Sequence, residues 1–359
     1  MSKAAELAKA GETLTNQPSG RKNLVTNGAM QVAQRSASET GLGAAAGYFT
    51  LDRFKMSIND ASAGRYTMAQ VADGPDGFAN CLKISTTTAD TSIAAGEVLL
   101  LGTKFEGQDL QQLKKGTSDA EYVTVSFYVK GNAAATYTCE FEDHDNTRSI
   151  QQAFAVTTDW NRIELTFAPD TSGPLDDDNA NSLSLNFWLH AGSTFTGGTF
   201  VSNAWKDTVN NTRLSDSQTS IFDATSRTFF ITGVQMEIGS QATNFEHRSF
   251  GEELALCSRY YQGTIGSGYF GVGRTANSSI MIQVPLTHEL RAVPSASLSA
   301  TTVTFAEPNA ANFNVTSASI ANAHTTARGG AYYINGTVTV GVGDNVFLST
   351  DYINMDAEL

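Results

Sequence analysis

The segment CEFEDHDN, at residues 139–146, holds the densest group of side chains that could do chemistry. It contains two glutamates, two aspartates and a histidine. A pair of carboxylates can supply the acid and the base of glycoside hydrolysis. Glu140 and Glu142, however, stand two residues apart and would share the solvent face of a strand, while Asp and Asn are favoured in tight turns. We therefore favour a hairpin over a hydrolytic site.

A second acidic segment, GPLDDDNANS at residues 173–182, could bind a cation. We take Asp176 and Asp178 as candidate ligands, because Ca²⁺ prefers about six to eight oxygen ligands. The spacing of the acidic residues does not match that of an EF-hand loop. A solvated acidic loop is therefore the favoured interpretation, a structural Ca²⁺ stays open as the alternative, and no other cofactor is expected.

Three aromatic residues are candidates for binding a glycan. Trp205 falls in the polar stretch VSNAWKDTVNN, and Tyr332 and Tyr333 fall in a strand-like stretch near the C-terminus. The face of an exposed aromatic ring can stack on the apolar face of a sugar. The alternatives are a loop residue that plugs the core, for Trp205, and packing between subunits, for the two tyrosines. Trp188 lies opposite the apolar face of its strand and should be either exposed or wedged under a loop.

The elements that must position these residues are strands. In EYVTVSFYVKG (121–131) and SLSLNFWLHA (182–191) apolar and polar residues alternate, which is the period of a half-buried strand. Such segments follow one another with turns and without helices between them, as in an antiparallel sandwich. The predicted fold is mainly β: a jelly-roll β-sandwich and a smaller second β-sandwich, with a short N-terminal helix and a short helical hinge. The expected boundaries are 1–22 for the helical attachment segment, 23–250 for the jelly roll, 251–262 for the hinge and 263–359 for the second sandwich.

Composition excludes several classes of protein. The chain of 359 residues has a net charge of −13, and an acidic surface repels nucleic acid and anionic lipid. Three cysteines without a CxxC pair give no disulfide framework, and no signal peptide or run of about 20 apolar residues is present. Motifs such as GxSxG or a phosphate-binding loop are also missing. We expect a non-enzymatic protein made in a cytoplasm, without nucleic-acid partners or membrane insertion.

Long segments of the chain resemble a family of tailed-bacteriophage virion proteins of the tail-fibre, tail-spike or head-fibre type, which carry carbohydrate-binding-like jelly rolls. The resemblance runs in order along the whole chain. Two departures are Phe54, where Trp is more usual, and the Thr-His-Glu-Leu-Arg stretch within residues 284–295. The segments that carry the resemblance are NLVTNGAMQVAQR (23–35), YFTLDRF (48–54), VSFYVKG (125–131), WNRIELTF (160–167), VQMEIGSQATNFEHRSFGEELALCSRYYQ (234–262) and the terminal DAEL.

The resemblance implies a jelly-roll body, assembly as a homotrimer and display on the virion surface. Residues 1–22 carry four basic side chains against two acidic ones and would attach the protein to other virion proteins. The function we expect is that of a tail-fibre or spike-type adhesion protein that binds host cell-surface glycan. A capsid decoration or head-fibre protein without a receptor role and a glycan-degrading tail spike stay open as alternatives.

Overall fold

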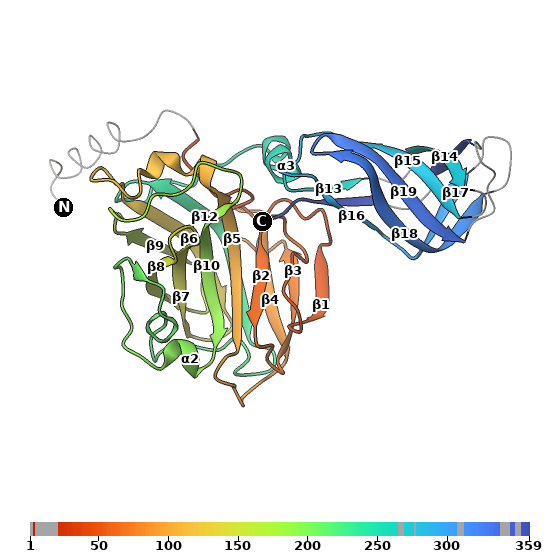
Figure 1. The fold of residues 1–359 in the computed structure, drawn as a ribbon. Coiled ribbons are helices and arrows are strands. Elements are labelled where there is room, and N and C mark those ends of the chain that lie inside the picture. Colours follow the sequence, from red (N-terminus) through yellow and green to blue (C-terminus); the bar gives the residue numbers. More distant parts are fainter. Residues whose placement is uncertain are drawn as a thin grey trace. The chain divides into compact units, whose positions relative to one another are not determined.

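The chain divides into two compact units, Met1–Phe250 and Gly251–Leu359, in a computed structural model (Figure 1). The structure describes Lys3 and residues 21–264, 269–275, 278–306, 312–337, 345–348 and 353–359. The predicted N-terminal helix falls almost entirely outside the described residues. The division into units falls at the position where the sequence pattern changes from alternating strands to a helix.

Unit 1 is built from two antiparallel sheets that pack face to face as a sandwich. The first, called here the β12 sheet, has the strand order β1 (Ser38–Leu42), β3 (Arg65–Val71), β4 (Cys81–Thr88), β12 (Thr228–Ile238), β6 (Val123–Gly131) and β9 (Asn161–Phe167). The second, the β10 sheet, has the order β11 (Lys206–Asp207), β8 (Arg148–Val156), β7 (Ala135–Asp143), β10 (Asn181–Ala191), β5 (Val98–Glu106) and β2 (Lys55–Asn59). Short helices lie in the connections: η1 (Gly107–Asp109), η2 (Gln111–Leu113), α2 (Ser193–Thr196) and η3 (Asn210–Thr212).

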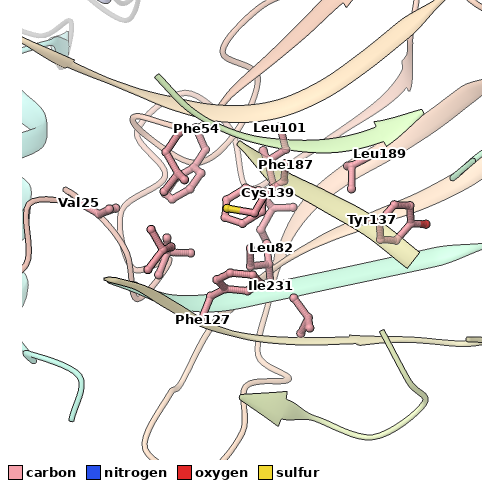
Figure 2. Packing of buried hydrophobic residues seen from close by; sticks show 14 of the residues in the cluster. Val25, Phe54, Leu82, Leu101, Phe127, Tyr137, Cys139, Phe187, Leu189 and Ile231 are labelled. Atoms are coloured by element: carbon pink, nitrogen blue, oxygen red, sulfur yellow. The ribbon is translucent and has the colours of Figure 1, made fainter. Parts of the chain in front are cut away.

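The alternation seen in the sequence decides which side chains fill the sandwich. Along β6 and β10 every second residue points inward, and the inward residues of both sheets form one core. Phe127 of β6 lies edge-on to Phe187 of β10, with ring centroids 5.0 Å apart. Figure 2 labels both residues among the side chains of this core. Cys139 of β7 is buried in the same core as a free thiol. The mainly β, antiparallel fold class is thereby confirmed.

The acidic segment 139–146 forms the hairpin that we favoured. β7 and β8 pair in register from Ala135–Val156 to Asp143–Arg148, and residues 144–147 make the turn between them. The Asp143 carboxylate caps this turn by accepting hydrogen bonds from the backbone amides of Asp145 and Asn146, both 3.0 Å long.

Unit 2 differs from the second sandwich that we expected, because its main sheet closes into a barrel. The strand order is β14 (Tyr269–Thr275), β15 (Ser279–Pro285), β19 (Gly329–Thr337), β18 (Phe313–Thr326), β17 (Thr302–Ala306) and β20 (Asn345–Leu348), and β20 pairs back onto β14. A smaller sheet contains β13 (Tyr261–Thr264), β21 (Ile353–Asp356) and β16 (Ser295–Leu298).

The long strand β18 explains why the sheet can close. Its register shifts between Thr316 and Ser319 and again between Asn322 and His324, and Ser317 has a φ of 53°. Such irregularities bend and twist a strand, so that β18 pairs with β17 through its first residues and with β19 over its length. Alternation alone is the same in a barrel and in a sandwich, and the sequence could not distinguish them.

The predicted helical hinge is a shorter helix, α3 (Phe250–Ser258), with Glu252 and Glu253 in its first turn. It ends before residue 262 because Tyr261 begins strand β13, which pairs with β21. Tyr260 and Tyr261 are both buried within the chain. The role of α3 as a hinge stays a prediction.

Candidate functional site

Trp205, the first candidate for glycan binding, is a half-buried plug at one end of the sandwich. Its ring packs against the core, and its indole N–H donates to the carbonyl oxygen of Ala168, 2.9 Å away. The cavity beside it measures about 20 Å³, which is room for a single water molecule. The arrangement matches the alternative of a loop residue that plugs the core, and the space beside the ring is too small for a sugar.

A buried ionic network fixes the position of Trp205. The Lys115 ammonium lies 5.0 Å from the centroid of the indole ring, 2.6 Å from a carboxylate oxygen of Asp143 and 3.1 Å from one of Asp170. Arg148 contacts Asp170 as well, at 2.9 Å. Although burial raises the pKa of Asp170, its hydrogen bonds, first of all the one from Arg148, leave the pKa below its ordinary value. Asp143 therefore forms a structural ion pair with Lys115.

The two tyrosine candidates differ in their surroundings. Tyr332 is fully buried in the core of the barrel, and its ring cannot contact a glycan in this structure, which corrects the sequence-based assignment. Tyr333 is half-buried on the same strand, β19. Nothing in the structure assigns it a ligand.

The aspartates of segment 173–182 give the cation alternative no support. Asp176 and Asp178 are both exposed, and Asp178 accepts a hydrogen bond from the Ala180 amide, 2.8 Å away. Within the described part of the chain, no group of three or more His, Cys, Asp or Glu side chains is placed to hold a metal ion. The structure is that of an acidic loop held by its own backbone contacts.

The outer face of the β10 sheet carries polar side chains from three neighbouring strands. The cross-strand pairing places Lys104 of β5 opposite Ser184 of β10, and Ser184 opposite Glu142 of β7. In the next row Gly102, Asn186 and Glu140 are aligned in the same way. We call the set of residues Lys104, Glu142, His144, Ser184 and Asn186 the polar strip.

Hydrogen bonds between its members hold the polar strip in place. His144 Nε2 lies 2.8 Å from Ser184 Oγ, and the Asn186 amide donates to Glu142 at 3.3 Å. Asn186 lies across Gly102, where an added Cβ atom would come within 2.5 Å of its side-chain oxygen. Loss of hydration and the positive charge of Lys104 lower the pKa of His144, although Glu142 opposes this change.

Next to the polar strip, the connection of residues 192–227 between β10 and β12 packs over part of the sheet and also supplies its edge strand β11; we call it the covering segment. Arg213 of this segment forms a bidentate contact with Glu140, at 2.7 and 2.5 Å, and a longer contact with Glu142, at 3.2 Å. The Trp188 indole N–H also donates to Glu140, and the Arg213 guanidinium lies 4.7 Å from the Trp188 ring centroid. Trp188 is thus wedged under a loop, one of the two positions that its place in the sequence allowed.

The environment of Glu140 excludes it as an accessible catalytic acid. Its carboxylate is completely buried, and burial raises its pKa while Arg213 counteracts this change. The sequence brought Glu140 and Glu142 together as a possible acid and base. In the structure Glu140 forms a buried ion pair with Arg213, and Glu142 beside it is half-exposed. The two are not a pair of carboxylates open to a substrate.

A second buried chain of polar groups could not be found from the sequence, because its members are far apart along the chain. Ser220 Oγ lies 2.7 Å from His190 Nδ1, and His190 Nε2 lies 3.0 Å from Glu97. Ser, His and Glu in this order occur in nucleophilic enzymes. Here the imidazole is fully buried and the Phe222 ring lies 5.2 Å from it, so it has no open side toward a substrate. We interpret the three residues as structural.

No family model matches the chain, and no curated protein matches it. Among solved structures it is similar to a CBM4 protein, with 13% identity and a TM-score of 0.32 over 60% of this chain and 99% of the other. A family 11 carbohydrate-binding module of Clostridium thermocellum has 16% identity and a TM-score of 0.27, over 64% and 99% of the two chains. A xylan-binding domain from Paenibacillus barcinonensis has 14% identity and a TM-score of 0.27, over 52% and 87%. At these values we draw no conclusion from the likeness, and the fold class rests on the strands themselves.

Within the described residues no helix has the length and apolar character that crossing a membrane requires.

The contact between Arg213 and Glu140 yields a stability prediction. Arg213→Met should lower the free energy of unfolding by about 3–5 kcal/mol, because it leaves the Glu140 carboxylate buried without its partner. The double variant Glu140→Gln/Arg213→Met should recover a large part of this loss, since it removes both charges. Urea denaturation of the two variants measures both values, and equal losses in the single and the double variant would contradict the argument.

The buried imidazole of His190 predicts a dependence of stability on pH. Burial lowers its pKa below the ordinary value of 6.5, although the facing carboxylate of Glu97, and more weakly that of Asp90, oppose this. The unfolded chain therefore binds more protons than the folded chain below that pH, and the free energy of unfolding should fall as the pH is lowered from about 6.5.

His190→Gln should make that decrease shallower in urea denaturation measured at several pH values between about 7 and 5. His144, whose pKa is also lowered, contributes in the same direction, and His144→Gln measures its share. A slope unchanged by His190→Gln would show that the imidazole does not titrate in this way.

Proposed function

We propose that this chain is a non-enzymatic structural and adhesion protein of a bacteriophage particle and that its sandwich binds host cell-surface glycan. The observation that carries the glycan part is the polar strip. Next to the covering segment, the β10 sheet presents the polar groups of Lys104 and Glu142, which are half-exposed residues, and of His144, which is an exposed residue of the turn after β7.

The chemistry of the polar strip suits sugar hydroxyl groups. Each hydroxyl both donates and accepts a hydrogen bond, and the strip offers the ammonium group of Lys104 on β5, the carboxylate of Glu142 on β7 and the imidazole of His144 in the turn after β7. His144 is held by Ser184 and Glu142 by Asn186, so these two side chains lose little freedom on binding.

A shallow polar surface of this kind binds weakly at each site. Millimolar affinity corresponds to roughly −4 kcal/mol, and display of several copies can raise the apparent affinity by about 10²–10⁴. Adhesion by a multivalent particle therefore does not require a deep pocket in each copy.

The virion part of the proposal is supported by the sequence segments that resemble phage fibre and spike proteins. In it, residues 1–22 attach the protein to other virion proteins, the chains form a homotrimer, and the protein is displayed on the virion surface after synthesis in the host cytoplasm. A capsid decoration or head-fibre protein without a receptor role is the rival within the same class, and adsorption of particles to the host distinguishes the two.

The rival from another class is a tail spike that degrades glycan. The burial and ion pairing of Glu140 and Asp143 weigh against it, because these two of the four carboxylates in the acidic hairpin are closed to a substrate. A hydrolase would still reveal itself by its product, since cleavage of a polysaccharide releases new reducing ends.

We expect Lys104→Ala to lower binding of the protein to host capsule or lipopolysaccharide by about tenfold, because a charge-assisted hydrogen bond is lost. Lys83→Ala, which removes the same charge from the outer face of the β12 sheet, is the matched control and should bind as the unchanged protein does. Retardation in gels containing the polysaccharide measures both. Equal binding by all three proteins would remove the strip from the site, and a steady release of reducing ends would favour the spike.

We expect light scattering on the purified protein to give the mass of a trimer. The reason is the resemblance, together with an N-terminal segment whose sequence predicts a helix too short and too sparsely apolar to be stable alone. Removal of residues 1–22 should leave a folded sandwich and prevent incorporation into particles. A monodisperse monomer at micromolar concentration contradicts the trimer, and normal incorporation of the truncated protein places the attachment elsewhere.

A further inference from the structure

An exposed aromatic ring stands beside a concavity at one end of the sandwich. Tyr122 precedes β6, and 48% of its surface is exposed. The concavity beside it has a volume of about 530 Å³, within the range of small-molecule sites. Its lining joins the region of η2 to the end of β12: Gln112, Lys114, Glu121, Tyr122, Ile238, Gly239 and Ser240.

The backbone around Tyr122 holds this surface in place. The Tyr122 carbonyl oxygen accepts a hydrogen bond from the Gly239 amide, 2.8 Å away, and the Glu121 amide donates to the carbonyl oxygen of Leu113, 3.0 Å away. Gly239 has a φ of +123°, a conformation that L-residues rarely adopt, and no atom lies within 4 Å of where its Cβ would stand. The concavity is therefore preformed, and it is open at Gly239.

The charges in the concavity compensate each other. Lys114 Nζ lies 2.7 Å from a carboxylate oxygen of Glu121, and both side chains are partly exposed. The hydrogen bond from Lys114 to Glu121 raises the pKa of the lysine, so its ammonium group stays charged near neutral pH. An ammonium group and a carboxylate side by side offer donors and acceptors without net charge, which favours a neutral polyhydroxylated ligand over an ion.

We propose that this concavity, the Tyr122 site, binds one neutral pyranose ring of a polysaccharide. The apolar face of the sugar stacks on the Tyr122 ring, while its hydroxyl groups bond to the pair of Lys114 and Glu121 and to the Gln112 amide. The proposal shares the class of ligand with the proposed function and rests on it to that extent. It uses other residues, at a place distinct from the polar strip.

The Tyr122 site takes the role that the sequence suggested for Trp205. Glu121 lines both the small cavity beside Trp205 and the concavity beside Tyr122, so the two aromatic residues serve the same end of the sandwich. Trp205 is held inward by its hydrogen bond to Ala168, whereas Tyr122 presents its ring to solvent. Of the two, only Tyr122 has both an open face and a space of sufficient volume.

The test uses the full-length protein and neutral methyl pyranosides of glucose, galactose and mannose as probes. Saturation-transfer difference NMR detects weak binding and shows which sugar protons approach the protein. Tyr122→Ala should lower the affinity for the bound sugar by about tenfold, or roughly 1.4 kcal/mol, because the stacking surface is lost. Tyr122→Phe keeps the ring and should bind within about twofold of the unchanged protein.

Two further variants separate this inference from the proposed function. Ile93 is an apolar residue in the connection before β5 with a similar exposure, 42% against 48% for Tyr122. Ile93→Ala is the control for a general surface effect and should bind normally. Lys104→Ala tests the polar strip in the same assay. Loss in Tyr122→Ala with normal binding by Lys104→Ala supports the Tyr122 site and overturns the strip, and loss in both variants supports both sites.

Other outcomes overturn the Tyr122 site. If Lys104→Ala loses binding and Tyr122→Ala binds normally, the Tyr122 site is wrong and the strip stands. If the unchanged protein binds none of the three probes, the Tyr122 site is also wrong. A Tyr122→Ala variant that binds sugar normally but has a smaller mass in light scattering would identify the exposed ring as a contact between copies of the chain.

Discussion

The arrangement of the outer face of the β10 sheet depends on the buried ion pair of Glu140 and Arg213. A fully buried carboxylate is costly unless it is neutralised and hydrogen-bonded. Here Arg213 supplies two contacts and the Trp188 indole a third. Because Arg213 belongs to the covering segment and Glu140 to the sheet, the requirement to satisfy one carboxylate fixes where the covering segment lies.

The position of the covering segment divides the outer face of the β10 sheet into two parts. On one side Trp188 packs with Phe195 and Leu214 of the covering segment in a small apolar cluster of its own. On the other side the polar strip stays partly open. Arg213 contacts Glu142 as well as Glu140, so the residue that closes the apolar part also orders the edge of the polar part. Stability and the arrangement of the candidate site are therefore coupled through one side chain.

Sequence patterns predicted the parts of the fold that depend on local periodicity. The inward residues of β6 and β10, the hairpin at 144–147 and the helical signal after Phe250 all follow from spacing along a short segment. Closure of the barrel depends on bulges in β18 and on pairing between β14 and β20, which are remote in the chain. The same limit applies to the site: Tyr122 stood in the sequence as one polar-face residue of a strand, and only the fold brings Gly239 and Lys114 around it.

Burial explains why aromatic residues were a poor guide to the candidate site until the fold was in view. Trp, Tyr and Phe contribute to cores and to sugar-binding surfaces through the same apolar faces, and the residue type does not distinguish the two. Trp205 and Tyr332 both pack inward. Trp205 closes one end of the sandwich, and Tyr332 fills the core of the barrel. Tyr122 directly precedes strand β6, and about half of its surface is exposed. An exposed aromatic ring at such a place forfeits the hydrophobic stabilisation that burial would give it, and binding of a ligand to the ring is a physical reason for a chain to carry it there.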